Sequence, residues 1–423
     1  MEELTDAARE AFPDTFVGQP FSSFSVFLEF LAHQASAQDA PVVAVIDELP
    51  YLSEGDRGLL TVLQHWWDDN KLRRNLKLFL AGSYTAFMER QVLDVNAPLY
   101  NRRTAAMKLE PMDYAGAGLF FPKYAAAEKM QAYAILGGMP SYLEQFDPAV
   151  SIAENVKSTI LRQNTYLSEE PDWLLLQNLR KDTVYGSILR AIAHGERKPT
   201  DIARAIGRDS AQDIGAALDN LRGLGLVVRE VPVTETRQSR SRNSLYWIDD
   251  GYIDFWYRFV DPSRSLVARG LGERLWTQSI EPNLQHYASR PAFERACRQF
   301  LWRELGADNL PADLDIANIG TWWGSGDREI DIVCVDAANK VLLVGECKWT
   351  NSPMDISDYA SVVADIDRAG ADLGVEASKL GTAAGPWIAL FSRSGFDPRL
   401  ADLAAAQDPS RLLLFSLDDM YAV

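Results

Sequence analysis

The sequence has few cysteines, no long apolar run and no glycine-rich phosphate-binding motif. Its three cysteines, Cys297, Cys334 and Cys347, cannot form a disulfide framework, and without a CxxC spacing they do not indicate a structural zinc site. No uncharged apolar run approaches the roughly 18 residues that a transmembrane helix needs. The chain begins with MEELTDAARE, which is acidic, whereas a signal peptide begins with a basic segment. The sequence therefore predicts a cytoplasmic protein with no membrane partner.

Basic residues are scarce relative to acidic ones. Lys and Arg number 42 and Asp and Glu number 59, so the net charge is −17. A chain with this excess of negative charge does not bind nucleic acid non-specifically, and any such contact must come from a local basic patch. Aromatic residues make up 10% of the 423 residues, which is ample core material for two to four domains and excludes long-range disorder.

The N-terminal third alternates between strand and helix patterns. Residues 41–47, PVVAVID, form an apolar β-branched run that is typical of a strand buried in a parallel sheet. Residues 56–68 have leucines at helical spacing, and residues 76–83, LKLFLAGS, form a second apolar run. Strand, helix and strand in this order predict an α/β layer, and residues 125–165 predict further helices.

Polar residues follow both predicted strands, as in a nucleotide site. Asp47 and Glu48 end the first strand, where an Asp can hold Mg²⁺ through water and a Glu can orient an attacking water. Ser83 ends the second strand, where a small polar side chain can sense a γ-phosphate. Arg102 and Arg103 could contact a phosphate in trans. The alternatives are that the Asp-Glu pair caps a turn and that the two arginines form a solvated basic turn.

No GxxxxGK[ST] motif occurs in the chain. Without that loop and its lysine the chain has no cradle for phosphates, so tight ATP binding is not expected. Two explanations stay open: the nucleotide site is inactive, or the sequence lacks its true N-terminus. We expect the second, because a phosphate-binding strand and helix normally precede the Asp-Glu strand. The resulting partial sheet would expose a hydrophobic edge.

Residues 181–248 have the pattern of a winged helix-turn-helix. Three short helical patterns within 181–229 lead into a predicted hairpin, with strands at 226–233 and 243–248. Four arginines in this hairpin could contact nucleic-acid phosphates: Arg229, Arg237, Arg240 and Arg242. The alternatives are a simple exposed loop and a protein-binding role, because a winged helix does not by itself prove DNA binding.

The last third predicts a separate α/β unit. Its predicted elements are helices at 291–304 and 356–371 and strands at 329–335, 341–347, 386–391 and 411–416. Such a mixture of strands and helices predicts a sheet covered by helices.

Carboxylates and a lysine interrupt two of these strands. Alternation places Glu329 and Asp331 on one face of their strand, and Glu346 and Lys348 on one face of the next. Asp331 and Glu346 carry the hard oxygen ligands that Mg²⁺ prefers. Lys348 can steady an attacking water and a phosphate, and Glu294 in the preceding helix could add a carboxylate. The alternative is a Lys-Glu pair on a solvated sheet face.

Several motifs in this order resemble the archaeal-type P-loop ATPase family, which is AAA+-like and whose C-terminal region resembles PD-(D/E)xK nucleases. The motifs are VVAVIDELPYL, LFLAGSYTAFM, LYNRRTAAMKLEPM, ILGGMPSYL, YWIDDGYIDFWYRFV and GECKW. The resemblance implies that Asp47 and Glu48 correspond to the Walker B motif and Ser83 to the sensor position. It implies that Arg102 or Arg103 is the arginine after the sensor strand. The nuclease motif then falls on Glu294, Asp331, Glu346 and Lys348.

Together these patterns predict an α/β protein of three parts. These are a partial P-loop NTPase sheet with a helical lid (1–165), a winged helix-turn-helix domain (173–260) and a restriction-endonuclease-like α/β domain (268–423). We expect an ATPase-family protein that acts on DNA with Mg²⁺, with ATP as a second cofactor if a P-loop is supplied. The alternatives are a non-catalytic nucleotide-switch regulator that binds DNA or a protein partner, and an ATPase-only machine resembling STAND-type switches. Homo-oligomers are a further expectation.

Overall fold

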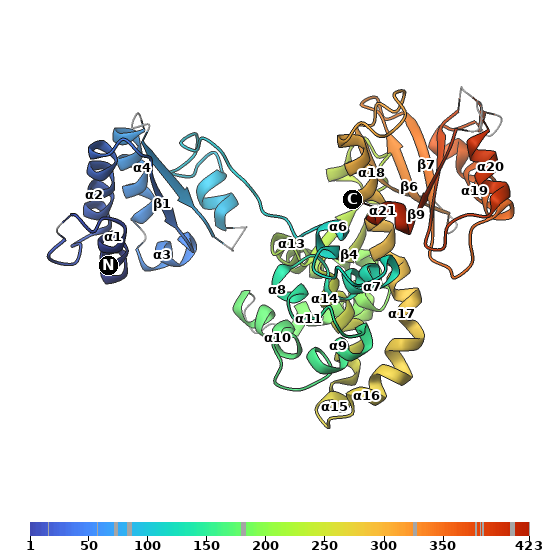
Figure 1. Ribbon diagram of the computed structural model, residues 1–423, viewed down its shortest axis with the longest axis horizontal. Coiled ribbons are helices and arrows are strands. Elements are labelled where there is room, and N and C mark those ends of the chain that lie inside the picture. The colour runs from blue at the N-terminus through green and yellow to red at the C-terminus, as the bar shows by residue number, and fades with distance from the viewer. Residues whose placement is uncertain are drawn as a thin grey trace. The chain divides into compact units, whose positions relative to one another are not determined.

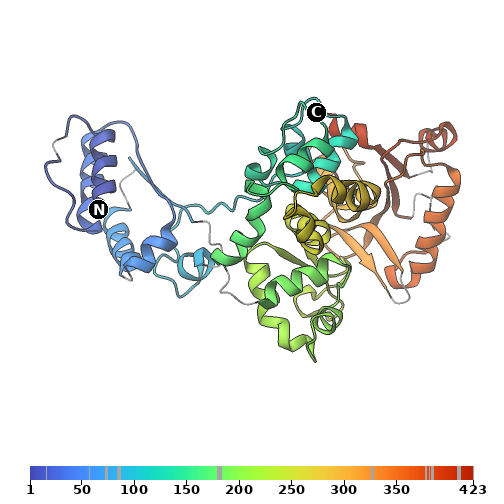
Figure 2. The same ribbon diagram turned by 90° about the horizontal axis from the view of Figure 1, so that it is seen from below.

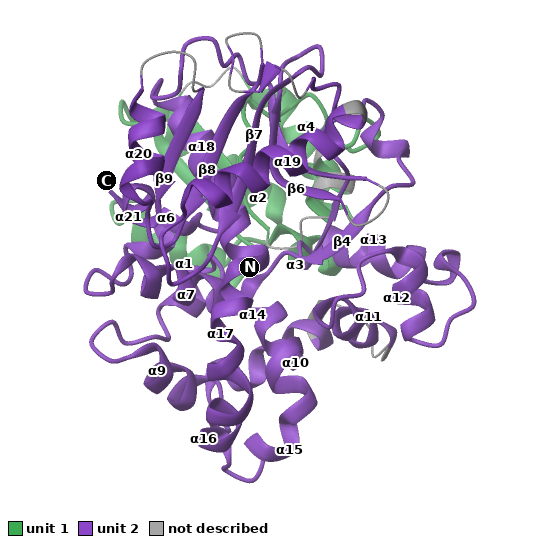
Figure 3. Ribbon diagram, turned by 90° about the vertical axis from the view of Figure 1, so that its right-hand side faces the viewer, with its two compact units in different colours: residues 1–109 green, residues 110–423 purple. Residues whose placement is uncertain are grey.

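The computed structural model describes residues 1–422 except 16, 57, 72–74, 83–86, 179–182, 325–327, 377–378, 381, 383–384 and 407–410. The chain divides into two compact units, Met1–Leu109 and Glu110–Val423 (Figure 3). Both units contain strands and helices, so the mixed α/β class is confirmed. Among the described residues, no helix has the length and hydropathy that crossing a bilayer requires.

Unit 1 is a two-stranded parallel sheet covered by helices on one face. Its elements are α1 (Glu2–Ala11), α2 (Phe24–Ala37), β1 (Val42–Ile46), α3 (Leu49–Gly55), α4 (Leu59–Asn70), β2 (Leu76–Leu80) and the π-helix η1 (Met88–Leu93). Register pairs run from Val42 with Leu76 to Ile46 with Leu80. Leu28 of α2 and Leu63 of α4 are buried in one hydrophobic core with Val42, Ile46 and Leu76 of the sheet. Helix α2 lies beside the sheet in Figure 1.

The other face of this small sheet is apolar and exposed. Val43, Val45 and Phe79 expose 59%, 64% and 57% of their surface. Strand alternation explains the pattern, because the neighbouring residues of each strand point into the core. The sequence predicts exposed hydrophobic surface at the edge of a partial sheet, and these three side chains expose such surface on the face of the sheet.

Unit 2 begins with a helical part. Its elements up to residue 223 are α6 (Tyr114–Gly118), α7 (Ala126–Leu136), α8 (Pro140–Leu143), α9 (Ile152–Thr159), α10 (Tyr166–Asn178), α11 (Thr183–Ala193), α12 (Pro199–Ala205), η2 (Ala211–Ile214) and α13 (Gly215–Gly223). After a hairpin the helices resume as α14 (Gly251–Phe255), η4 (Trp256–Val260), η5 (Asp261–Ser263), α15 (Arg264–Val267), α16 (Gly272–Leu275), η6 (Trp276–Ile280), α17 (Glu281–Tyr287) and η7 (Ala288–Phe293).

The helices of 110–165 belong to unit 2, whereas the sequence groups them with the N-terminal sheet. Tyr114 is fully buried and donates a hydrogen bond to the carbonyl oxygen of Met420 at 2.8 Å. Residues of α7 share one hydrophobic core with Tyr252 and Phe255 of α14. Packing against later segments, which no local pattern encodes, therefore sets the division at Leu109.

Helices α11, α12 and α13 precede an antiparallel hairpin, β3 (Val227–Glu230) and β4 (Leu245–Ile248), with a short 3₁₀ turn, η3 (Gln238–Arg240), in its loop (Figure 2, green to yellow-green). Ile202 and Leu221 are fully buried between these elements. Gly207 and Gly225 have positive φ values of 72° and 73°, a conformation that glycine adopts without strain. The strands are shorter than the predicted 226–233 and 243–248.

A five-stranded mixed sheet dominates the C-terminal part. The elements are α18 (Glu294–Gly306), β5 (Asn318–Trp323), β6 (Glu329–Val335), β7 (Val341–Lys348), α19 (Ile356–Leu373), β8 (Trp387–Ser392), α20 (Pro398–Ala405), β9 (Leu412–Ser416) and α21 (Leu417–Tyr421). The strand order is β5-β6-β7-β8-β9. The first two pairings are antiparallel and the last two are parallel.

Helices cover both faces of this sheet (Figure 1). Phe300 of α18 packs in one core with Cys334, Leu343 and Phe391. On the other face, α19 shares a core with Val333, Val344 and Leu390, and its residue Ile366 lies in that core. All six predicted segments correspond to elements of this sheet and its helices, whereas β5 was not predicted.

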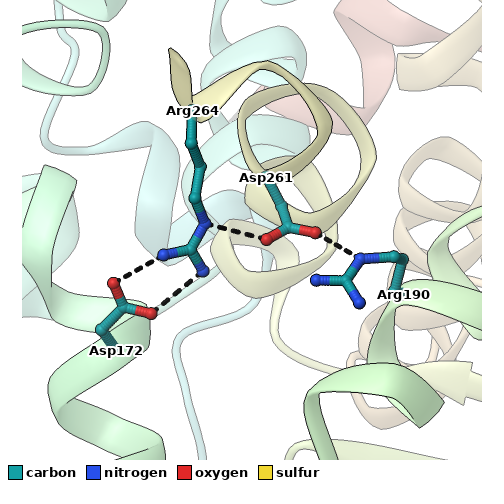
Figure 4. Close-up of polar contacts among 4 residues, drawn as sticks. All are labelled: Asp172, Arg190, Asp261 and Arg264. Atoms are coloured by element: carbon teal, nitrogen blue, oxygen red, sulfur yellow. Dashed lines mark hydrogen bonds and ion pairs between the residues drawn. The ribbon is translucent and has the colours of Figure 1, made fainter. Parts of the chain in front are cut away.

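Four charged side chains join three helical segments of unit 2 (Figure 4). Asp261, whose side chain is 3% exposed, accepts hydrogen bonds from Arg190 at 2.6 Å and from Arg264 at 2.9 Å. Arg264 also donates two bonds to Asp172 of α10, at 2.8 and 3.0 Å, and its guanidinium lies 4.1 Å from the ring centroid of Trp256. Because the Arg264–Asp172 pair is bidentate and the shared carboxylate of Asp261 is buried, we interpret the network as a structural clamp.

Candidate functional site

The sequence-predicted residues of the last third come together at one end of the sheet. Strands β6 and β7 are antiparallel with Ile332 opposite Gly345, so Asp331 and Glu346 are the next positions in register. The backbone N–H of Cys347 donates to Asp331 Oδ2 at 2.9 Å. Glu294 opens helix α18 and is 8% exposed. With Glu329, these side chains form what we call the carboxylate cluster: Glu294, Glu329, Asp331 and Glu346.

The carboxylates of this cluster lie within one another's electric field. Burial, and then the charge of Asp331, raise the pKa of Glu294 from its ordinary 4.5 to about 8. The same two causes raise the pKa of Glu346 to about 8. Burial also raises the pKa of Asp331, although the hydrogen bond from Cys347 acts in the opposite direction. Such shifts arise when negative charge is concentrated where water cannot solvate it, which is common at functional sites.

Cationic side chains surround the cluster. Lys348 forms an ion pair with Asp358 of α19, whose other carboxylate oxygen accepts the N–H of Asp355 at 3.0 Å. Arg290 forms ion pairs with Glu329 and, at 3.5 Å, with Glu294. The sequence did not identify Arg290 or Asp358. Arg290 precedes Pro291 and has an extended backbone (φ −141°, ψ 129°), so helical spacing to Glu294 gives no signal for this pair.

The residue types fit Mg²⁺ better than their arrangement does. Carboxylate oxygens are the ligands that this ion prefers. Nevertheless, in the described ranges no three His, Cys, Asp or Glu side chains converge closely enough to hold a metal ion. Asp331 accepts a backbone N–H, and Glu294 is paired with Arg290.

The predicted basic hairpin is attached to the sheet. The N–H of Val233 donates to the carbonyl oxygen of Thr321 in β5 at 2.9 Å, and Trp323 Nε1 donates to Asn243 Oδ1 at 2.9 Å. Arg229 donates to the carbonyl oxygens of two loop residues, at 3.0 and 2.6 Å, so it braces the loop. The other three predicted arginines are exposed to solvent: Arg237, Arg240 and Arg242.

A small cavity separates the hairpin from the carboxylate cluster. Its walls include Glu230 and Trp247 from the hairpin, Trp323 from β5, and Glu294 and Glu329 from the cluster. Arginines also contribute to the lining, among them Arg290, Arg295 and Arg298. The hairpin and the cluster are therefore adjacent within unit 2.

In unit 1, Asp47 and Glu48 follow β1 at the edge where β2 also ends. Asp47 is exposed, and its Oδ1 accepts the N–H of Glu48 at 2.9 Å. Glu48 has a positive φ of 48°, which is uncommon for a residue other than glycine. Its Oε2 is buried and has no hydrogen-bond partner within the described part of the chain. Ser83 lies outside the described residues.

The two N-terminal arginines differ in their surroundings. Arg102 donates to both carboxylate oxygens of Asp68, at distances between 2.8 and 3.1 Å, and to the carbonyl oxygen of Pro98 at 2.9 Å. The hydrogen bond from Arg102 lowers the pKa of Asp68. Arg103 is exposed. In this arrangement Arg102 supports unit 1 internally, and Arg103 has the more accessible side chain.

Comparisons with known proteins place the cluster within a shared segment. Residues 256–359 match a family described as archaeal and bacterial proteins of unknown function. An uncharacterized protein of Methanocaldococcus jannaschii is 28% identical over 334 residues, which cover 79% of this chain and 73% of that protein. The solved structure of a Walker-type ATPase of Pyrococcus abyssi is 20% identical with a TM-score of 0.44, covering 61% of this chain and 77% of that chain. The family segment includes the whole carboxylate cluster as well as Arg290 and Lys348.

Proposed function

We propose that the sheet of unit 2 carries a Mg²⁺-dependent nuclease-like site that acts on DNA. The supporting observation is the carboxylate cluster itself, in which Asp331 on β6 lies beside Glu346 and Lys348 on β7 with Glu294 of α18 next to them. The order of elements resembles the restriction-endonuclease-like arrangement. It consists of helix α18, the antiparallel strands β5, β6 and β7, and strand β8, which follows helix α19. Function is argued from the site rather than from that arrangement.

Each residue has a distinct proposed role. Asp331 and Glu346 would hold Mg²⁺, with Glu294 as a further ligand, and the ion would supply a more acidic bound water and neutralise phosphate charge. Lys348 Nζ would donate hydrogen bonds to the attacking water or to a phosphate oxygen. For this role it must share or leave Asp358, its partner in the ion pair.

The hairpin would position the nucleic acid. The exposed arginines Arg237, Arg240 and Arg242 supply local positive charge in a chain whose net charge is −17. Phosphate contacts of this kind fix register without reading sequence. Arg229, the fourth predicted arginine, would act indirectly by holding the loop in shape.

Unit 1 would contribute an ATPase-derived function. Asp47 and Glu48 lie where a Walker B pair would lie, at the end of a parallel strand. The buried Oε2 of Glu48, which has no hydrogen-bond partner among the described residues, is compatible with a group that orients water. This proposal also includes ATP as the nucleotide, Ser83 as the sensor, and Arg103 or Arg102 as a phosphate contact in trans.

A non-catalytic regulator is the second candidate. It is favoured by the cation pairing in the cluster, since Arg290 and Lys348 are both bound to carboxylates. In that case the winged helix-like segment would bind DNA or a protein, and the nuclease-like sheet would support it.

Cleavage of labelled single- and double-stranded DNA with Mg²⁺ or Mn²⁺ distinguishes the two candidates. We expect wild type and Glu304→Ala to cut, because Glu304 lies on α18 outside the cluster. Asp331→Ala and Lys348→Ala should lose activity. Equal products from all four proteins, or none from any, would contradict the nuclease proposal, and DNA binding without cleavage would support the regulator.

A further inference from the structure

We propose that Arg393 binds a phosphate of the nucleic-acid backbone where the parallel strands of unit 2 end. The proposal rests on the proposed DNA-acting function for the source of the phosphate, and it requires neither a metal ion nor the movement of a side chain. It adds a nucleic-acid contact outside both the hairpin and the carboxylate cluster.

Arg393 is held in place by neutral groups. Its Nη1 donates to Gln285 Oε1 of α17 at 2.7 Å and to Asn351 Oδ1 at 2.5 Å. Its guanidinium lies 5.0 Å from the ring centroid of Trp349, a buried side chain whose Nε1 donates to the same oxygen of Gln285 at 2.9 Å. Two amide oxygens and an aromatic ring therefore fix the orientation of the guanidinium without neutralising its charge.

The other edge of this guanidinium is open. Within the described part of the chain, Nε and Nη2 of Arg393 have no hydrogen-bond partner, and neither atom is buried. The N–H groups of Nε and Nη2 lie side by side on one edge of the planar group, which is the geometry that binds two oxygens of a phosphate at once. Because Nη1 is already anchored, little side-chain freedom is lost when a phosphate binds this edge.

The charge of Arg393 is not paired with a carboxylate among the described residues. By contrast, Arg290, Arg295 and Arg298 each form an ion pair with an Asp or Glu. Partial burial lowers the pKa of Arg393, and no neighbouring acid opposes that effect. In a chain of net charge −17, such an uncompensated cation supplies the local positive potential that a nucleic-acid contact requires.

The position of Arg393 suits a ligand that crosses the end of the sheet. Strands β7, β8 and β9 are parallel, and ligands of such sheets bind beyond the carboxyl ends of the strands. Arg393 directly follows β8, and its N–H donates at 3.1 Å to the carbonyl oxygen of Lys348, the last residue of β7. A nucleic-acid strand that crosses this end of the sheet therefore meets Arg393 beside Lys348, the residue with a proposed role at the reacting phosphate.

Binding of the full-length protein to a fluorescein-labelled DNA duplex tests this proposal. Fluorescence anisotropy is measured at several salt concentrations, with EDTA present to prevent cleavage. We expect Arg393→Gln to weaken binding about tenfold, because it removes a charge-assisted pair of hydrogen bonds. The slope of log affinity against log salt concentration should decrease by about 1, since one phosphate contact is lost.

Two controls make this result specific. Duplexes of two unrelated sequences should lose affinity by the same factor, because a phosphate carries no sequence information. Arg399→Gln makes the same change at an exposed arginine of α20, and should bind like wild type. Circular dichroism checks that both variants are folded.

A labelling experiment on the wild type covers the case in which Arg393→Gln does not fold. Phenylglyoxal modification of Arg393, measured by mass spectrometry, should decrease several-fold when the duplex is added, with Arg399 as an internal reference. If wild type binds the duplex, but Arg393→Gln binds it as tightly and the labelling of Arg393 does not change, the Arg393 proposal is wrong and the DNA-acting function stands.

Inorganic phosphate distinguishes the two sources of the bound group. If wild type does not bind the duplex, and inorganic phosphate protects Arg393 from labelling, the site takes a free phosphate. In that case the backbone contact and the DNA-acting function are both wrong.

Discussion

Replacement of Glu294 by Gln should stabilise the protein at neutral and alkaline pH. Glu294 is 8% exposed, and its pKa is raised from 4.5 to about 8 by burial and by Asp331. The folded state therefore binds this proton more tightly than the unfolded state does. The contribution of Glu294 to stability is therefore greatest below about pH 4.5, falls as the pH rises toward 8, and then levels off. Gln has a similar shape and no charge to bury.

The size of the effect follows from the shift. Each pH unit between the two pKa values costs about 1.4 kcal/mol of folding free energy. At pH 7 this gives an upper bound of about 3 kcal/mol for Glu294→Gln relative to wild type. The gain is smaller, about 1–3 kcal/mol, because protonation of the neighbouring Asp331 or Glu346 relieves part of the repulsion.

Urea unfolding between pH 5 and pH 8.5 measures this difference. The free energy of unfolding of Glu294→Gln minus that of wild type should increase with pH across this range. Glu304→Gln, a change of the same type on the same helix outside the cluster, is the matched control. A difference that stays constant with pH, or a variant less stable than wild type at pH 8.5, would refute the reasoning, because the ion pair with Arg290 would then outweigh the burial of charge.

Three further substitutions test packing in unit 2. Asp261→Ala leaves two arginines of the clamp in Figure 4 without their shared carboxylate. It should lower the free energy of unfolding, measured with urea, by about 3 kcal/mol. A loss below about 1 kcal/mol would show that the clamp is a weak surface pair. Gly138→Ala would place a Cβ 1.9 Å from the carbonyl oxygen of Met112 and should lower the melting temperature sharply. Gly215→Ala, which meets nothing within 4 Å at the start of α13, should be neutral or stabilising, and equal effects of the two alanines would contradict this account.

Local patterns predicted much of the C-terminal sheet. Strand β6 has the predicted bounds, 329–335, and β7 extends the predicted 341–347 by one residue, because each is an apolar run of β-branched and other large side chains. Strand β5 was missed. It is an edge strand that contains Gly320, and it is completed by a hydrogen bond from Val233 in the distant hairpin loop. No local pattern reports a partner so far along the chain.

Only part of the candidate site was predicted, again because local patterns do not report contacts between distant segments. Alternation within β6 and β7 placed Asp331, Glu346 and Lys348 on their strands, and helical spacing placed Glu294 near the start of α18. The pairing of Arg290 with Glu329, 39 residues apart, depends on how η7 packs against β6 and has no signal in the sequence. The same is true of Arg229, which was expected to contact phosphates and instead braces its own loop.

Burial of the cluster argues against the alternative of a solvated Lys-Glu pair. An exposed pair would leave its carboxylates near their ordinary pKa, whereas Glu294 and Glu346 have pKa values of about 8. Stability alone does not account for keeping such charges, since a chain with neutral side chains at these positions would fold at a lower free-energy cost.

If the reason is a divalent cation, Mn²⁺ should reverse the order of stability of wild type and Glu294→Gln. Wild type should gain in melting temperature with Mn²⁺ at pH 8, while Glu294→Gln gains less. Equal gains in both proteins would mean that Mn²⁺ binds elsewhere, and that the cluster serves a purpose other than holding a metal.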